Sequence, residues 1–358
     1  METTPSRAAP RKPASGAAAK PPPWKSLVAK YQKPDVSASI QQFCVTLAAF
    51  LGMAALTMYS LNIGYWLTVL LAIPTAGFLV RLFIVQHDCG HGSFFRSRKL
   101  NDSVGMICSI FTLTPYHYWQ RSHSIHHAHA NNLEHRGIGD IYLMTVNEYQ
   151  AQNWWGRLRY RLYRNPIVLF IIGPSLMFIV IHRFPGYSQP AMKKVAHTVW
   201  WTDLALLIFY GALALLVGWQ AVAITVLTVM FFAAGAGMWL FYVQHQFEGV
   251  QWDHEEKWDF GLAALQGASY YKLPRILQWF TGNIGFHHIH HLSPRIPNYK
   301  LEQCHNENEM FQDATVLTIP TSLKMMTLTL WDEERRELIS FRELKQRQKK
   351  LTPQTAQS

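Results

Sequence analysis

Histidines spaced three or four residues apart occur in three short runs of this 358-residue chain, which contains 17 histidines in all. On a helix, residues with this spacing share one face, so each run can direct several imidazoles at one point. The runs are His87 and His91, then His123, His126 and His127, and last His287, His290 and His291. Imidazole nitrogen binds iron, zinc, copper and nickel, so three such runs predict a metal centre.

One more histidine, His245, lies near the end of a long uncharged stretch. Ionisable residues at membrane depth are usually functional, so we predict His245 as a ligand rather than as an ordinary interfacial histidine. His288 could replace His287 as the i, i+3 partner of His291, and the sequence leaves that choice open. The three runs and His245 together give nine candidate metal-ligating and catalytic residues.

Nine imidazoles exceed what a four-coordinate zinc ion can bind, but they suffice for two metal ions with four or five ligands each. A shell rich in histidine and poor in carboxylates suggests redox-capable ions, and iron that activates O₂ fits this donor set. Candidates for orienting the imidazoles by hydrogen bonds are Asp88, Asp140, Glu248, Asp253 and Asn283. Trp119, Trp154, Trp155, Trp200 and Trp201 fit an aromatic belt at a membrane interface.

Long apolar segments must position these histidines. No Asp, Glu, Lys or Arg occurs between Val36 and Val80, or between Leu204 and Phe247. A helix needs about 20 apolar residues to cross a bilayer, so each stretch is long enough for two crossings. Turn-like residues divide each stretch, which predicts membrane helices over residues 40–60, 65–84, 198–217 and 221–243. The buried core of a soluble protein would keep charged residues on its solvent side, and these stretches have none.

Each predicted hairpin returns the chain to the side of the membrane that it left, so distant runs can meet in space. The hairpin tips carry no Lys or Arg, whereas the segments before, between and after the hairpins carry many. The positive-inside rule therefore places both termini and the active site in the cytosol. The formal net charge of +11 follows largely from this bias, and we recognise no nucleic-acid-binding module.

The sequence thus predicts an all-α integral membrane protein with four transmembrane helices in two hairpins, interfacial helices and a cytosolic helical cap that carries the histidine cluster. Residues 1–35 are predicted as a disordered basic cytosolic tail, 36–330 as the membrane domain, and 331–358 as a charged tail that forms a solvated surface helix. The apolar segments 104–113 and 167–181 are too short to span and are expected at the interface. The four cysteines form no C-x-x-C pair, which predicts free thiols and a reducing compartment.

The sequence around the runs resembles that of the membrane fatty acid desaturases. HDCGHGSFFRSRKLND at His87, HSIHHAHANNLEHRGIGDIY at His123 and GNIGFHHIHHLSPRIPNY at His287 are similar to the omega-6 (delta-12) acyl-lipid type. The similarity extends over about residues 43–299. It implies a di-iron centre that uses O₂ and is held by the nine candidate histidines. It also implies a ferredoxin or cytochrome b5-type electron donor, and a cis double bond placed in a fatty acyl chain.

The acyl-CoA branch of these enzymes differs from this sequence at two places. That branch has H-x-x-x-x-H in its first run and N-x-x-x-H before its third. Here the first run is one residue shorter, and Phe241 stands four residues before His245. The resemblance therefore favours an acyl-lipid enzyme over an acyl-CoA enzyme.

Two alternatives stay open at this point. Related di-iron enzymes share these runs but hydroxylate, ketolate or conjugate a fatty acid or a carotenoid, because the outcome depends on how the substrate is held. A metal transporter or sensor could also carry histidine-rich cytosolic loops. A transporter is expected to bury polar residues at the bilayer midplane, and the predicted spans contain few of them, which argues against that class.

Overall fold

The computed structural model of the chain describes residues 24–186 and 189–351. The α-helices are α1 (Trp24–Ala29), α2 (Val36–Tyr59), α3 (Tyr65–His91), α4 (Arg98–Thr112), α5 (Tyr116–His129), α6 (Val146–Ala151), α7 (Trp154–Tyr163), α8 (Gly173–Ile179), α9 (His197–Val217), α10 (Trp219–His245), α11 (Phe260–Gln266), α12 (Arg275–Phe280), α13 (His287–Leu292), α14 (Asn298–Asn306), α15 (Ile319–Met325) and α16 (Phe341–Leu351). Shorter helical turns are η1 (Ser60–Asn62), the π-helical η2 (Val168–Ile172), η3 (Ile181–Arg183), η4 (Pro190–Val195) and η5 (Glu309–Phe311). The strands are β1 (Met144–Thr145), β2 (Tyr270–Tyr271), β3 (Val316–Leu317), β4 (Leu330–Asp332) and β5 (Glu337–Ile339).

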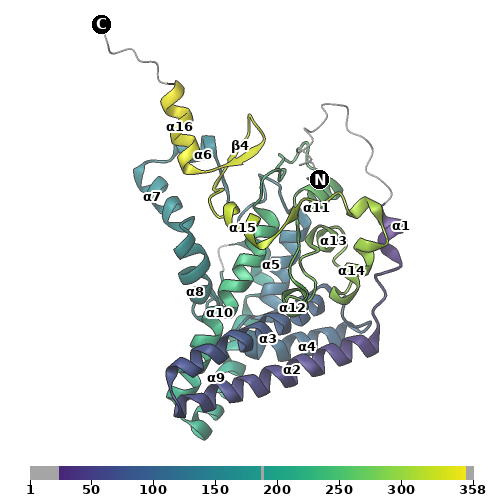
Figure 1. The fold of residues 1–358 in the computed structure, drawn as a ribbon, viewed down its shortest axis with the longest axis vertical. Coiled ribbons are helices and arrows are strands. Elements are labelled where there is room, and N and C mark those ends of the chain that lie inside the picture. Colours follow the sequence, from purple (N-terminus) through teal and green to yellow (C-terminus); the bar gives the residue numbers. More distant parts are fainter. Residues whose placement is uncertain (1–23, 187–188, 352–358) are drawn as a thin grey trace, which may run out of the picture.

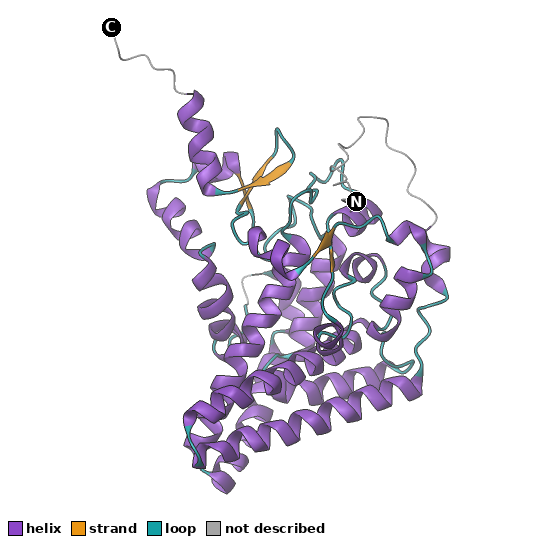
Figure 2. Cartoon of the chain, viewed as in Figure 1, coloured by secondary structure: helices purple, strands orange, loops and turns teal. Residues whose placement is uncertain are grey.

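Four helices of the described residues are long and apolar enough to cross a membrane, namely α2, α3, α9 and α10. Consecutive helices pack against each other, α2 with α3 and α9 with α10. Figure 2 shows a chain that is mostly helical, with small strands on the side away from the long helices. The predicted fold class, a helical membrane protein with four spans and a histidine cluster, is confirmed.

The second helix of each pair runs further than the sequence predicted. Helix α3 ends at His91 rather than at residue 84, and α10 ends at His245 rather than at residue 243. The helices continue because most residues of these last turns are buried among neighbouring elements, and α3 passes through Gly90 before it ends at Gly92. Gly92 adopts a left-handed conformation with φ of 67° and ends α3 with a glycine cap.

Helix α3 lies at the centre of the long helices, where it packs against α2, α4 and α10. Hydroxyl pairs join α2 and its turn to α3 inside the apolar interface. The Oγ1 atoms of Thr57 and Thr75 lie 2.8 Å apart, and Ser60 Oγ lies 2.9 Å from Thr68 Oγ1. A polar group without a partner is costly in lipid, so these pairs favour one register of the two helices.

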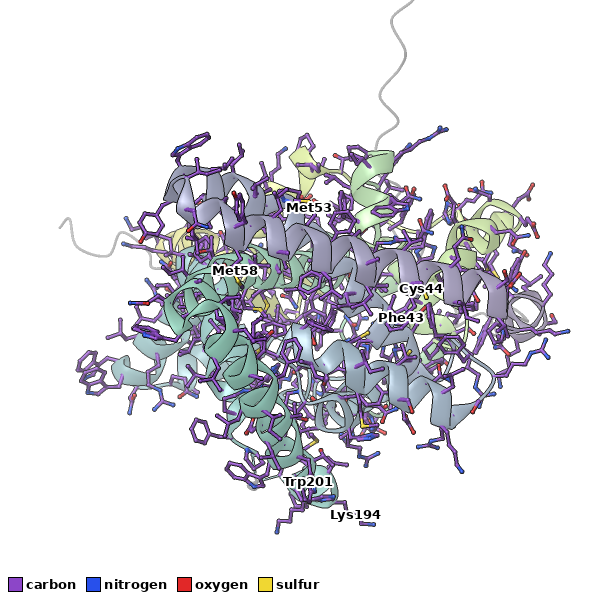
Figure 3. The ribbon with its side chains drawn as sticks, turned by 90° about the horizontal axis from the view of Figure 1, so that it is seen from below. Phe43, Cys44, Met53, Met58, Lys194 and Trp201 are labelled. Atoms are coloured by element: carbon purple, nitrogen blue, oxygen red, sulfur yellow. The ribbon has the colours of Figure 1, made fainter. Side chains whose placement is uncertain are left out.

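The outer faces of the long helices are apolar. Figure 3, seen from below, shows α2 with Phe43, Cys44, Met53 and Met58 along it, and α9 diverging from it with Trp201 on its outer side. The side chain of Trp201 is two-thirds exposed, at 66%. Exposed apolar side chains on helices of this length are what lipid contact requires.

The two short apolar segments form helices of their own. Residues 104–113 lie mostly in α4, which packs against α3 and α9. Residues 167–181 form η2 and α8, and this stretch is bent by 56° from α7. Their location at the membrane interface stays a prediction.

The N-terminal segment is ordered closer to its start than the sequence suggested. Residues 1–23 of the predicted disordered tail lie outside the described residues, but residues 24–35 contain helix α1. Val28 and Tyr31 are buried in an apolar cluster with Leu301 and Phe311. Disorder as far as residue 35 was therefore wrong, because these apolar side chains find partners that lie over 250 residues away in sequence.

The C-terminal segment begins as a β-hairpin and not as a surface helix. Strand β4 pairs with β5 in antiparallel fashion and with β1 in parallel, and Trp331 on β4 is 1% exposed. Only α16 has the predicted helical form. Arg347 on α16 binds Asp332 at 2.6 Å and Glu337 at 2.7 Å, which ties that helix to the hairpin. The surface-helix prediction rested on the high charge of this segment and overlooked its apolar residues, which pack inward.

Candidate metal centre

The predicted histidines come from the ends of two long helices and from two short helices that face them. His87 and His91 occupy the last turns of α3, and His245 is the last residue of α10. The second run lies on α5 and the third on α13. Figure 1 shows α5 and α13 beside one another at the ends of α3 and α10. Both long helices therefore deliver ligand candidates to the same level of the molecule.

The structure brings eight of the nine candidates into two groups, each with ligand atoms within 4.8 Å of one another. The first histidine group consists of His87, His91, His123, His127 and His290. The second histidine group consists of His126, His245 and His291. Each group has enough nitrogen donors in one place to hold a metal ion.

Adjacent histidines on one helix serve different groups. On α5, His127 belongs to the first group and His126 to the second, and on α13 His290 and His291 divide in the same way. Successive residues on a helix point about 100° apart, because a turn takes 3.6 residues. An H-H pair therefore faces two sites at once, and the two groups must be neighbours.

Short distances between imidazole nitrogens link the helices across the centre. The Nε2 atoms of His127 and His290 lie 3.0 Å apart, and those of His126 and His245 lie 3.2 Å apart. His287, the ninth candidate, lies outside both groups but next to the second, with its Nε2 atom 3.0 Å from that of His245. The lone pairs of facing imidazoles thus converge on common points.

His288 points away from the two groups. Its Nε2 atom lies 3.0 Å from the carbonyl oxygen of Phe311, and its ring lies beside His305. It therefore does not take the place of His287 near the second group. The other histidines that lack the run spacing are also outside both groups.

Burial keeps the candidate ligand imidazoles of α5 and α13 neutral. It is the main cause that lowers their pKa well below the usual histidine range, and the charge of neighbouring histidines lowers it further. This holds for His123, His126, His127, His287, His290 and His291. A neutral imidazole has a free lone pair, which is the form that binds a metal.

Several buried ring nitrogens have no hydrogen-bond partner among the described residues. They include Nε2 of His91 and Nε2 of His291, one from each group. A buried polar atom without a partner is costly, and native structures usually satisfy it. A metal ion in each group would satisfy these nitrogens, so the residues present fit such ions.

Two contacts to Nδ1 atoms orient candidate ligands. Asp88 Oδ1 lies 3.4 Å from Nδ1 of His87, and the carbonyl oxygen of Gly267 lies 3.3 Å from Nδ1 of His245. The other oxygen of Asp88 accepts hydrogen bonds from the backbone N–H and the side-chain amide of Asn298, at 2.7 and 2.8 Å. Such partners set ring orientation in metal sites. The sequence did not predict the contact of Gly267 with His245, because every residue has a backbone carbonyl and none can be singled out from sequence alone.

Trp119 is also part of the centre, although the sequence suggested an interfacial belt. Its ring stacks on His123 with centroids 4.7 Å apart and planes 16° apart. It also lies 5.3 Å from the ring of Phe83. The available signal was its position four residues before His123 on α5, which puts both on one helix face.

Comparisons with known proteins agree on one family. A family model described as fatty acid desaturase matches residues 62–320, which include every candidate histidine. A fatty acid desaturase of Bacillus subtilis is 43% identical over 318 residues, which cover 89% of this chain and 90% of the relative. Two proteins of Synechocystis, an sn-1 oleoyl-lipid 12-desaturase and an sn-1 acyl-lipid omega-3 desaturase (ferredoxin), are 29% and 28% identical. They cover 72% and 76% of this chain, and 70% and 75% of their own lengths are matched.

Proposed function

The chain belongs to the fatty acid desaturase family, and we propose that it uses two iron ions and O₂ to place a cis double bond in the acyl chain of a membrane lipid. The family makes the protein an oxidoreductase that acts on fatty acyl chains. The metal, the nine ligands, the position of the double bond and the orientation in the membrane are parts of the proposal.

One observation carries the proposal, which is the division of adjacent histidines between two neighbouring groups. One structural zinc ion needs a single tetrahedral group, whereas two neighbouring groups suit a pair of ions. His87, His91, His123, His127 and His290 are the proposed ligands of one iron, and His126, His245, His287 and His291 those of the other. Iron at these positions would supply, with O₂, an oxidant strong enough to remove hydrogen from an unactivated methylene.

The protein's own residues provide position and shielding. The second histidine group lies against Phe241, whose ring is 5.1 Å from that of His126 and 5.2 Å from that of His245. Trp119 and Phe83 cover the other side, next to His87 and His123. Aromatic walls at the ends of membrane helices favour an acyl chain and exclude water from the reacting carbons.

Sequence similarity supports the delta-12 (omega-6) position and the electron donor. One Synechocystis relative is an oleoyl-lipid 12-desaturase, and the printed name of the other includes ferredoxin. We therefore propose a delta-12 acyl-lipid substrate and a ferredoxin or cytochrome b5-type donor. The donor must reach the centre from the side that carries the histidine groups.

The positive-inside rule supports a cytosolic position for that side. Figure 1 shows α1, α5, α13 and α16 on the same side of the long helices. This arrangement fits an enzyme whose two termini and active site share the cytosol.

The test is expression in a host with a simple fatty acid profile, followed by gas chromatography and mass spectrometry of its lipids. We expect a new dienoic acid from the native chain and none from His123→Ala or His290→Ala. His197→Ala, at an exposed position outside both groups, is the matched control and should keep the product. A hydroxylated product would favour a related reaction, and an unchanged profile from iron-loaded protein would rule out desaturation.

A further inference from the structure

A narrow recess opens beside the second histidine group and carries polar residues that the proposed metal site does not use. Its walls include His126 and His245, together with Asn131, Asp140, Gln246 and Trp252. It encloses about 290 Å³ with its mouth included, and its interior admits water-sized molecules only. The recess is too narrow for an acyl chain, but it has room for a water-sized molecule.

The indole of Trp252 provides an independent sign of a small polar ligand. Trp252 is 4% exposed, and its Nε1–H has no hydrogen-bond partner among the described residues. A buried donor that is left unsatisfied is costly, and native structures usually give it a partner. Buried waters usually make about three hydrogen bonds to such groups. Trp252, Asp140 and Asn131 all line the recess, so a donor and two side chains with acceptor oxygens border one space.

Asp140 links the recess to the solvent. Its side chain is half-buried, it lines the recess, and its Oδ1 atom accepts a hydrogen bond of 2.8 Å from the backbone N–H of Gly137. Burial raises the pKa of the Asp140 carboxyl, although the Gly137 N–H and nearby Arg136 act in the opposite direction. The guanidinium of Arg136 is itself held by two hydrogen bonds to Glu148, at 2.6 and 2.9 Å. Within residues 24–186 and 189–351, Asp140 has no ion-pair partner of its own, and its half-buried side chain keeps one side toward solvent.

The proposed reaction creates a need for protons at this place. An acyl –CH₂–CH₂– group, one O₂, two electrons and two protons give –CH=CH– and two H₂O. Two C–H bonds of the acyl chain break, four O–H bonds form, and O₂ is reduced while the acyl chain is oxidised. The electrons come from the external donor, but the two protons must cross from solvent into a buried centre.

We infer that the recess holds an ordered water and that Asp140 passes protons through it from the cytosol to the second histidine group. Trp252 holds this water in place by donating from Nε1, and Asp140 exchanges protons with solvent at its outer side. Asp140 is thus a proton-delivery residue and Trp252 a positioning residue. This inference rests on the proposed desaturase function.

The kinetic test uses full-length, iron-loaded enzyme in lipid nanodiscs with a reduced ferredoxin, and compares Asp140→Asn and Trp252→Phe with the native chain. Asp140→Asn keeps the acceptor for Gly137 but cannot carry a proton. Turnover should fall at least about tenfold, because positioned proton transfer contributes about 10²–10⁴-fold. Peroxide released per O₂ consumed should rise, and the rate should slow more in D₂O than it does for the native chain. Asp140→Glu should restore part of the rate.

The control is Glu256→Gln, an exposed carboxylate outside the recess, which should match the native chain in every readout. Iron content and melting temperature should be unchanged in Asp140→Asn and Trp252→Phe. A native rate and a native peroxide yield in Asp140→Asn would overturn the inference. A native chain that forms no double bond would instead overturn the proposed function.

A second measurement does not depend on activity. In a cryo-electron microscopy map of iron-loaded protein, we expect density for a water within hydrogen-bond distance of Trp252 Nε1. The same density should be weaker or absent in Trp252→Phe. A native map in which side chains fill the recess and no water is present would refute the water-mediated route.

Discussion

The rings of His127 and His291 stack with centroids 4.1 Å apart and planes 12° apart, although the two residues belong to different histidine groups. They come from α5 and α13, which are over 150 residues apart in sequence. The stack forms a common wall between the groups. The two proposed metal positions therefore depend on each other through packing as well as through shared helices.

This common wall predicts that removal of one ring affects both groups. His127→Ala should lose its own ion and also weaken metal retention in the second group by about tenfold, the lower range for loss of a supporting contact. Iron per chain and its rate of release to a chelator measure both effects, with His197→Ala as the control. If one ion leaves and the other is released at the native rate, the groups are independent.

Asp88 predicts a second effect on metal binding. Asp88→Asn removes the carboxylate charge behind His87 but can keep an acceptor for Asn298, so the fold should persist. Metal affinity should fall about 10- to 100-fold, as is usual for loss of such a partner. Competition with a chelator of known affinity gives the value. Asp313→Asn, at an exposed position, should bind metal like the native chain.

Because Trp331 is buried, we predict that the C-terminal hairpin contributes to the stability of the fold. Trp331→Ala should destabilise the protein by about 3–5 kcal/mol, the usual cost of removing a large aromatic side chain from a core. Thermal unfolding in one detergent measures the loss. Leu323→Ala, on α15 and 53% exposed, should change the melting temperature far less. If both substitutions lowered the melting temperature by the same amount, burial of Trp331 would not be what stabilises the hairpin.

His254 predicts a pH dependence of the contact between the hairpin tip and the loop after α5. Hydrogen bonds that His254 donates to the carboxylates of Glu134 and then Glu333 raise the pKa of His254 above its usual value. A raised pKa in the folded state stabilises the protein below the unfolded value of about 6.5, and this contribution is lost as the pH rises through the raised pKa. The pKa of Glu134 is lowered by the same bond, so its share is lost only in acid.

The difference in melting temperature between the native chain and His254→Gln should therefore be larger at pH 6 than at pH 8. Glu256→Gln, a neighbouring exposed position, should show no such difference. A gap that is constant between these pH values would contradict a charged His254 bridge.

Patterns with a physical period were readable in the sequence. Uncharged length predicted the four long helices, and i, i+4 spacing predicted that His87 and His91, and His123 and His127, lie together. The expectation that each run points at one place was wrong for the i, i+3 pairs, because His126 belongs to a different group from His123. The two groups themselves could not be anticipated, since they depend on how α3, α5, α10 and α13 pack.

The features that were missed depend on partners distant in sequence. Val28 and Tyr31 look like parts of a charged tail until Leu301 and Phe311 cover them. Trp331 looks like the start of a solvated segment until β1 pairs with β4. The composition of a segment shows which of its side chains are apolar. Whether those side chains are buried depends on distant segments that pack against them.

The sharing of consecutive histidines by the two groups has a consequence for how this centre can vary. The step from one residue to the next along a helix is set by the covalent backbone, with a rise of about 1.5 Å. Substitutions in the surrounding aromatic walls can reshape the space for substrate, but they cannot move His126 relative to His127 without unwinding α5. The step from His126 to His127 is thus fixed by the chain itself, and changes in substrate specificity have to arise around this unchanging pair of neighbours.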